Sequence, residues 1–312
     1  MRRGARTPRR WHAVVAGLLV AVVLAGCGSG GVTDDRLKVV ATTTVFADLV
    51  ARVGGDRVDV VSLVPKGGEV HTFDPTPSDV RRLVQADLVV RNGLGLDDWL
   101  AGLARDAGAT APIVALGEDL PGVTYLGGSA GTGTGGGEPV NPHLWLNAAY
   151  AGLYVDRIAD ALATADPAHA ADYRTAGETY GAELAALDEE TRTRLGAIPA
   201  KDRKVISFHD AFPYFAEAYG LTVSGTVVES PGQDPSAAQV EALVRTIDRE
   251  GIRAIFAEAQ FNDDLAQAIA GETDAVVVSD LHTDTLGDAP LDSYVAMMRS
   301  NVDKVVEALS GP

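Results

Sequence analysis

Two kinds of hydrophobic pattern alternate along this chain. Short runs rich in Val, Leu and Ile are typical of buried β-strands, and segments whose apolar residues recur every three or four positions are typical of amphipathic helices. Alternation of the two favours a parallel sheet with helices on its faces. The elements predicted in the first half are strands at 37–43, 58–64, 86–93 and 111–116, and helices at 44–55, 77–84 and 95–107.

The same alternation returns after a long helical segment. Asn147 is a typical N-cap for a helix that ends near Ala163. A second helix begins at Asp166-Pro167 and keeps helical spacing to about Ala197. At 1.5 Å per residue it spans roughly 45 Å, more than one small domain needs, which indicates a connector. Beyond it we predict strands at 204–208, 221–228, 254–258 and 274–280, and helices at 212–220, 236–251, between the last two strands and from about 291.

The predicted fold class is α/β, with two lobes that each contain a mostly parallel sheet flanked by helices. One long rigid connector helix joins them. We place the N-terminal lobe at 37–166, the connector at 167–197 and the C-terminal lobe at 198–312. Because an uninterrupted helix cannot absorb the φ/ψ changes of a hinge, we expect little closure of the lobes. The glycine-rich run at 127–137 predicts a surface loop that is dispensable for any metal site, since it contains neither His nor Cys.

Residues 1–26 have the composition of an export leader. Five arginines precede an apolar stretch, Ala13 to Leu24, that is too short to cross a bilayer comfortably. The run that follows, Leu24-Ala25-Gly26-Cys27, resembles the lipobox of bacterial lipoproteins. The resemblance implies that Cys27 becomes the lipidated first residue of the mature protein, with 27–36 as a tether. The alternative is an ordinary secretory leader with an incidental cysteine.

The cysteine content and the net charge limit the kinds of site and ligand that the chain can have. Cys27 is the only cysteine, so the chain forms no intrachain disulfide and no thiolate metal site. Removal of residues 1–26 takes away five arginines and no acids, which moves the net charge from −17 to −22. A body this acidic is not expected to bind nucleic acid, and it attracts cations.

Three histidines and one aspartate form a candidate metal site. His71, His143 and His209 each lie at a junction between a predicted strand or helix and a loop, and Asp284 lies just beyond the last predicted strand. Imidazole and carboxylate are ligands that borderline first-row metals prefer. Ligands of open α/β sheets bind beyond the carboxyl ends of the strands. With two candidates from each lobe, a cleft between the lobes would bring all four together.

Each of these residues has an ordinary alternative. A lone histidine is more often a surface or hydrogen-bonding side chain than a ligand, and only the repeated junction position reverses that balance. Asp210, Asp280 and His282 are nearby substitutes for Asp284. Glu258, at the end of its strand, is a candidate outer-shell partner for an imidazole N–H.

Longer motifs around these residues resemble one protein family. HTFDPTPSDV begins at His71, NPHLWLN contains His143, SFHDAFPYFA contains His209 and DLHTDTLGD contains Asp284. The chain resembles the zinc and manganese solute-binding lipoproteins of bacterial ABC importers over nearly all of 37–309. The resemblance implies these four residues as ligands, delivery of the ion to an ABC permease and its ATPase, and an extracytoplasmic, lipid-anchored location. We expect a monomer.

The chain departs from the family pattern in three places. Glu69-Val70 stands where an acid or amide followed by proline usually precedes the first histidine. Asn141 and Asn147 replace aspartates that flank the second histidine, which removes two possible outer-shell charges. The loop that is histidine-rich in many zinc members is here glycine-rich, which removes one indication of zinc.

Zinc is the metal that the residue types favour. Three imidazoles and a carboxylate suit Zn²⁺, and nitrogen-rich sites bind zinc far more tightly than manganese. Manganese is the runner-up, because such sites occur in family members assigned to either metal. Zinc needs unprotonated imidazoles, so binding should weaken below about pH 6, near the pKa of free histidine.

Two functions of other classes compete with transport. A zinc hydrolase needs an open coordination position and a general base, whereas four protein ligands close the site and no H-E-x-x-H is present. We therefore expect no enzyme. An adhesin or a zinc chaperone would use the same metal site for another partner, and the sequence leaves that alternative open.

Lipid attachment at Cys27 gives a first prediction. Two or three acyl chains hold a protein firmly on a membrane, whereas one holds it only marginally. A Cys27→Ala variant should therefore be released into the soluble fraction or accumulate with its leader uncleaved, as seen by cell fractionation and mass spectrometry. Equal membrane retention of the variant and the wild type would contradict the lipid anchor.

Overall fold

The computed structural model describes residues 1, 35–128 and 139–311, and from Arg36 onward the chain forms one compact unit. The predicted leader, Cys27 and most of the glycine-rich run lie outside the described residues. Within the described ranges, no helix combines the length and the apolar character needed to cross a membrane.

The N-terminal lobe contains a parallel four-stranded sheet in the order β2-β1-β3-β4. Helix α2 begins where the sequence predicted, because the Asp79 carboxylate accepts the Thr76 backbone N–H at 2.8 Å and so closes the first turn. The elements are β1 (Leu37–Ala41), α1 (Thr44–Gly54), β2 (Val58–Ser62), α2 (Pro77–Gln85), β3 (Leu88–Arg91), α3 (Trp99–Asp106), β4 (Ile113–Ala115) and α4 (Ala148–Ala165).

The C-terminal lobe repeats the arrangement, with a parallel sheet in the order β6-β5-β7-β8. Glycines in the left-handed region end two of its helices, Gly220 after α6 and Gly251 after α7, because a residue with a Cβ would be strained there. The elements are β5 (Lys204–Ser207), α6 (Pro213–Tyr219), β6 (Thr222–Thr226), α7 (Ala237–Glu250), β7 (Ala254–Glu258), α8 (Asp264–Gly271), β8 (Val276–Leu281) and α9 (Tyr294–Ser310).

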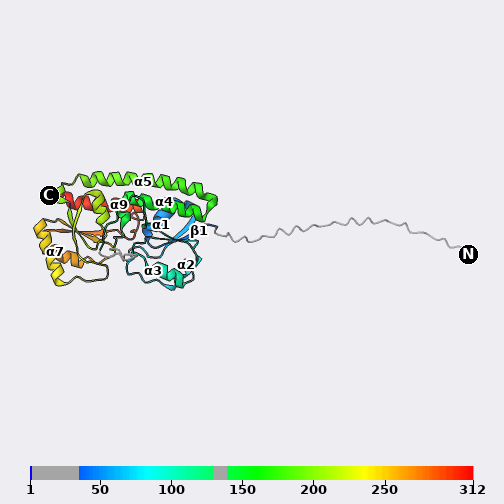
Figure 1. Cartoon of the computed structure of the whole chain (residues 1–312), viewed down its shortest axis with the longest axis horizontal. Helices are drawn as coiled ribbons and strands as arrows, with labels where there is room; N and C mark the ends of the chain where they lie inside the picture. The colour runs from blue at the N-terminus through cyan, green and yellow to red at the C-terminus, as the bar shows by residue number, and fades with distance from the viewer. Residues whose placement is uncertain (2–34, 129–138, 312) are drawn as a thin grey trace. The chain divides into compact units, whose positions relative to one another are not determined.

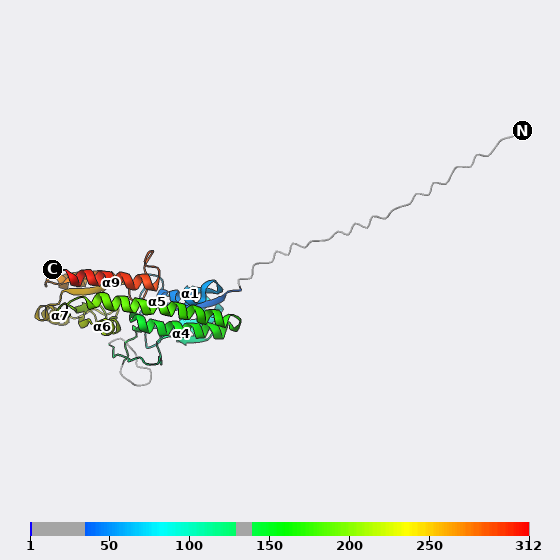
Figure 2. The same ribbon diagram turned by 90° about the horizontal axis from the view of Figure 1, so that it is seen from above.

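A single helix, α5 (Ala170–Gly196), runs along both lobes. Its 27 residues span roughly 40 Å. It contacts α1 and α4 of the first lobe and α6 and α9 of the second, and Figure 2 shows it lying between α4 and α9. The helix begins three residues later than predicted, since Pro167–His169 forms a 3₁₀ turn that leads into it.

Helix α5 runs along one side of both lobes (Figure 1), and its buried residues belong to a hydrophobic core that the lobes share. A continuous cluster of buried residues extends from the first sheet through α4 and α5 to the second sheet and α9. Within the first lobe, Phe46 of α1 packs edge to face on Trp145, with ring centroids 5.2 Å apart. One face of each sheet is therefore buried in this shared cluster, whereas the opposite face is buried by a smaller cluster within its own lobe.

Buried hydrogen bonds reinforce this seam. The Trp145 indole donates to the Thr283 carbonyl at 2.8 Å, and the Tyr294 hydroxyl donates to the Trp145 carbonyl at 2.6 Å. Across the same seam, the Leu286 N–H donates to the Thr44 hydroxyl at 2.7 Å. Parting the lobes would leave such buried groups without partners, which is costly.

The predicted fold class is confirmed: two sheets of parallel strands are flanked by helices and spanned by one long helix. Trp145 is fully buried and bridges the lobes. The boundaries proposed for the lobes and the connector stay a prediction.

The shared core and α5 together predict a rigid response to metal. The radius of gyration of the mature protein, measured by small-angle X-ray scattering, should be the same without metal and after loading with Zn²⁺. Metal-dependent change should concentrate in the loops that carry His71, His143, His209 and Asp284. A clear decrease in the radius of gyration on loading would overturn the rigid-connector interpretation.

Candidate metal site

Four candidate ligands converge where the carboxyl ends of the two sheets meet. His71 lies in the loop after β2, and His143 directly precedes η2 (Leu144–Leu146) and α4. His209 follows β5 and Asp284 follows β8. Each offers one donor atom, and these four atoms all lie within 4.8 Å of one another. The sequence had singled out this set, and its role as a ligand set is taken up below as a proposal.

The spacing of the donors suits one small cation. The Nε2 atoms of His143 and His209 lie 3.4 Å apart, and Asp284 Oδ1 lies 3.6 Å from His143 Nε2. His71 Nε2 lies 3.9 Å from Asp284 Oδ2. Tetrahedral zinc with bonds near 2.0 Å would place its donors roughly 3.3 Å apart. Small inward shifts of the side chains would therefore complete a four-coordinate site.

Burial makes this arrangement hard to explain without a cation. His143, His209 and Asp284 are fully buried, and the His71 side chain is 10% exposed. His71 Nε2 and Asp284 Oδ1 have no hydrogen-bond partner among the residues that the structure describes. Buried polar atoms are normally paired, and a bound cation would satisfy both.

Two outward-facing nitrogens have partners that fix the orientation of their rings. His143 Nδ1 lies 3.0 Å from the Asn141 side-chain oxygen, and His209 Nδ1 lies 3.0 Å from Glu258 Oε1. Such contacts leave Nε2 free to bind metal. Glu258 thus occupies the outer position expected for it. Asn141 holds the second histidine although it carries no charge, whereas Asn147 caps α4 by accepting the Ala149 N–H at 3.0 Å.

Two polar neighbours of the site were missed in the sequence. The Gln260 amide donates to Asp284 Oδ2 at 3.1 Å, and Glu69 Oε1 accepts the His71 backbone N–H at 2.7 Å. Gln260 lies two residues beyond Glu258 on the chain, so the carboxyl end of β7 supports two of the candidate ligands. No spacing or motif distinguishes this glutamine from a surface residue.

The substitutes considered for Asp284 lie outside the cluster. Asp280 is exposed, and its carbonyl accepts the Lys304 ammonium at 2.8 Å. His282 exchanges backbone hydrogen bonds with the Asn301 side chain. The Asp210 carbonyl accepts the Asn141 amide at 2.6 Å.

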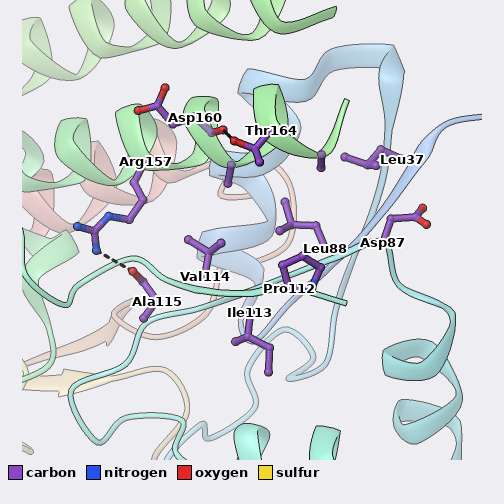
Figure 3. Close-up of a pocket in the computed structure, with 12 residues that line it drawn as sticks. Leu37, Asp87, Leu88, Pro112, Ile113, Val114, Ala115, Arg157, Asp160 and Thr164 are labelled. Carbon is purple, nitrogen blue, oxygen red and sulfur yellow. Dashed lines mark hydrogen bonds between the residues drawn. The ribbon is translucent and has the colours of Figure 1, made fainter. Parts of the chain in front are cut away.

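A separate groove lies at the other end of the first sheet (Figure 3). It measures about 750 Å³ and is lined by the amino ends of β1 and β3, by β4 and by the second half of α4. Its polar groups are already engaged: Arg157 donates to the Ala115 carbonyl and Thr164 to the Asp160 carbonyl, both at 2.8 Å. The groove therefore offers nothing comparable to the converging donors.

Comparison with known proteins identifies the family. Residues 39–308 match the sequence model of the ZnuA family, described as zinc-uptake complex component A, periplasmic. The chain belongs to this family. It is therefore a divalent-metal solute-binding protein of the kind that serves ABC importers, and not an enzyme.

The relatives of the chain are named for different metals. A manganese ABC transporter substrate-binding lipoprotein, PsaA, of Streptococcus anginosus is 29% identical over 303 residues, covering 94% of this chain and 96% of the relative. An iron ABC transporter substrate-binding lipoprotein, MtsA, of Streptococcus pyogenes serotype M1 is 28% identical over 313 residues, covering 97% and 99%. Among solved structures, the periplasmic zinc-binding protein TroA of Treponema pallidum matches with a TM-score of 0.78 and 27% identity, covering 88% and 99%.

Electrostatics divide the three histidines of this candidate site into two kinds. Burial, followed by the positive charge of His209, lowers the pKa of His71 to about 3 and that of His143 well below its ordinary value. Burial acts on His209 in the same sense, but the adjacent Glu258 carboxylate, together with the charges of Asp284 and Glu69, outweighs it and raises the pKa of His209 to about 9. Burial also raises the pKa of the Asp284 carboxyl. In the metal-free protein the imidazoles of His71 and His143 are neutral, whereas His209 carries a proton on both nitrogens: Nδ1 lies beside Glu258, and Nε2 faces the site.

This proton predicts the pH dependence of metal binding. A cation can use His209 only after displacing the proton, so below about pH 9 affinity should fall with decreasing pH. One displaced proton corresponds to about tenfold in apparent affinity per pH unit. Chelator-competition titrations with Zn²⁺ between pH 6.5 and 8.5 should show this slope, well above the onset near pH 6 expected for free histidine.

A Glu258→Gln variant is the control, because it removes the charge that stabilises the protonated imidazole. Its zinc affinity should depend much less on pH across the same window. Equal slopes for the variant and the wild type would contradict the assignment of the displaced proton to His209.

Proposed function

We propose that this protein binds Zn²⁺ with His71, His143, His209 and Asp284 as ligands and delivers the ion to an ABC permease. The observation that carries this proposal is the convergence of three imidazoles and one carboxylate within 4.8 Å in a buried site. Nitrogen-rich sites favour zinc over manganese by the Irving–Williams order, and four donors match the coordination number of zinc.

Manganese is the second candidate cargo. Its support is the name of PsaA, which matches 94% of this chain at 29% identity. The donor set argues against it, since manganese prefers oxygen donors and higher coordination numbers. Dialysis of the purified mature protein, followed by elemental analysis and competition between Zn²⁺ and Mn²⁺, separates the two. Retention of Mn²⁺ in the presence of equimolar Zn²⁺ would refute zinc as the cargo.

Delivery implies a location and partners. Attachment through lipidated Cys27 would hold the protein on the outer side of the cell membrane, beside its permease. We place entry and exit of the cation on the side of His71, because its side chain is partly exposed and the other three proposed ligands are fully buried. Deletion of the gene should impair growth when zinc is scarce, and excess zinc should restore that growth. This result would support transport over an adhesin or chaperone role.

Substitution of the ligands gives the sharpest test. Replacement of His71, His143 or His209 by Ala should each weaken zinc binding at least tenfold, which is about 1.4 kcal/mol or more. Asp284→Ala should also weaken it. Isothermal titration calorimetry with a competing chelator measures these losses.

Two matched variants control for nonspecific effects. His282→Ala removes a nearby imidazole that lies outside the cluster, and Asp280→Asn removes a nearby carboxylate while tolerating the left-handed backbone at that position (φ 57°). Both should bind zinc like the wild type. A histidine of the proposed set whose removal leaves affinity and stoichiometry unchanged is not a ligand.

A further inference from the structure

The two oxygens of the Asp284 carboxylate have different surroundings. Oδ1 faces the site, 3.6 Å from His143 Nε2, and has no hydrogen-bond partner among the described residues. Oδ2 lies 3.9 Å from His71 Nε2 and also accepts the Gln260 amide at 3.1 Å. Both oxygens therefore lie near candidate donors, but only Oδ2 already accepts a hydrogen bond from the protein.

Gln260 is held firmly in this position. Its amide also donates to the Thr283 hydroxyl at 3.0 Å, so it contacts two successive residues of the ligand loop. The backbone on both sides is fixed, because the Ala259 N–H donates to the Leu281 carbonyl at 2.8 Å and the Phe261 N–H donates to the Glu258 carbonyl at 3.0 Å. The amide thus reaches Asp284 from the turn directly after β7, whose backbone is held by these hydrogen bonds.

This contact bears on the number of oxygens that a cation receives. A carboxylate that binds through one oxygen completes four-coordinate geometry with three imidazoles, as zinc prefers. A carboxylate that binds through both oxygens raises the coordination number, as manganese and other oxygen-preferring cations favour. The Gln260 bond uses one of the two lone pairs of Oδ2 and restrains the plane of the carboxylate, which disfavours two-oxygen binding.

We infer that Gln260 is a specificity-determining residue, which holds Asp284 as a one-oxygen donor and so favours zinc over manganese. The inference rests on the proposed function and names the feature that selects among metals for the same ligand set. Gln260 itself does not touch the cation; it acts through Asp284.

The test compares two glutamines that make the same contact. Gln260→Leu removes the amide at the site, and Gln267→Leu removes an amide that donates to Asp263 Oδ2, also at 3.1 Å, on helix α8. Loss of an outer-shell partner typically lowers metal affinity 10–100-fold. In Gln260→Leu we expect zinc affinity to fall at least tenfold and manganese affinity to stay equal or rise, so the zinc-to-manganese ratio of affinities falls at least tenfold. Gln267→Leu should leave both affinities unchanged.

A spectroscopic measurement separates coordination from simple weakening. Co²⁺ bound by four donors absorbs far more strongly in the visible range than Co²⁺ bound by five or six. Co²⁺-loaded wild type and Gln267→Leu should give the strong four-coordinate spectrum, and Gln260→Leu the weak one. Thermal melting of the metal-free variants checks folding, and Gln260→Met serves in its place if the leucine variant does not fold.

The outcomes are distinct. Equal losses of zinc and manganese affinity, an unchanged ratio, or a changed ratio with an unchanged Co²⁺ spectrum would each overturn the role of Gln260. These results concern only the variant. A wild-type protein that binds no zinc, or that prefers manganese, would instead refute the proposed function, whatever the variant does.

Discussion

The imidazoles of His143 and His209 approach to 3.4 Å in a fully buried position, with the Asp284 carboxylate beside them. Polar groups are costly to bury unless they are paired. Two imidazoles this close also cannot both be positively charged without strong repulsion. The surrounding structure meets this constraint by pairing the outer nitrogens with Asn141 and Glu258. The inner atoms, Nε2 of each histidine and the Asp284 carboxylate, face one another, and a bound cation would offset the cost of burying them together.

The same constraint explains why the seam between the lobes is so well bonded. Trp145 lies two residues beyond His143, and its indole donates to the carbonyl of Thr283, the residue before Asp284. This one hydrogen bond therefore fixes a ligand segment of the first lobe against a ligand segment of the second. Donor spacing in the site depends on the seam, because a shift between the lobes would separate His143 from Asp284.

Much of this structure could be predicted from the sequence, and the failures have physical causes. Strands and helices were predictable because each carries its own hydrophobic period, and the start of α2 because Thr76 and Asp79 form a local cap. The candidate ligands could be predicted because they lie near the ends of strands whose carboxyl ends meet. Strand order could not be predicted, since it depends on packing between distant segments.

The contacts around the ligands were also inaccessible to sequence reasoning. Loss of charge at Asn141 suggested a lost partner for His143, yet an amide oxygen at the same position serves as the acceptor. Gln260 has no distinguishing pattern, because its role arises only where the end of β7 meets the loop after β8. The three-residue delay in the start of α5 reflects a 3₁₀ turn at Pro167, which the hydrophobic period does not encode.

Two of the hydrogen bonds between the lobes join residues near opposite ends of the chain. The Leu286 N–H meets Thr44 across 242 residues, and the Tyr294 N–H meets Asp48 across 246. During synthesis the first lobe is complete long before α9 and Asp284 emerge, so its apolar seam stays uncovered for most of that time. The candidate metal site is assembled last for the same reason. A nascent or truncated chain that lacks its final segment keeps the three candidate histidines but has neither the carboxylate nor the packing that positions them.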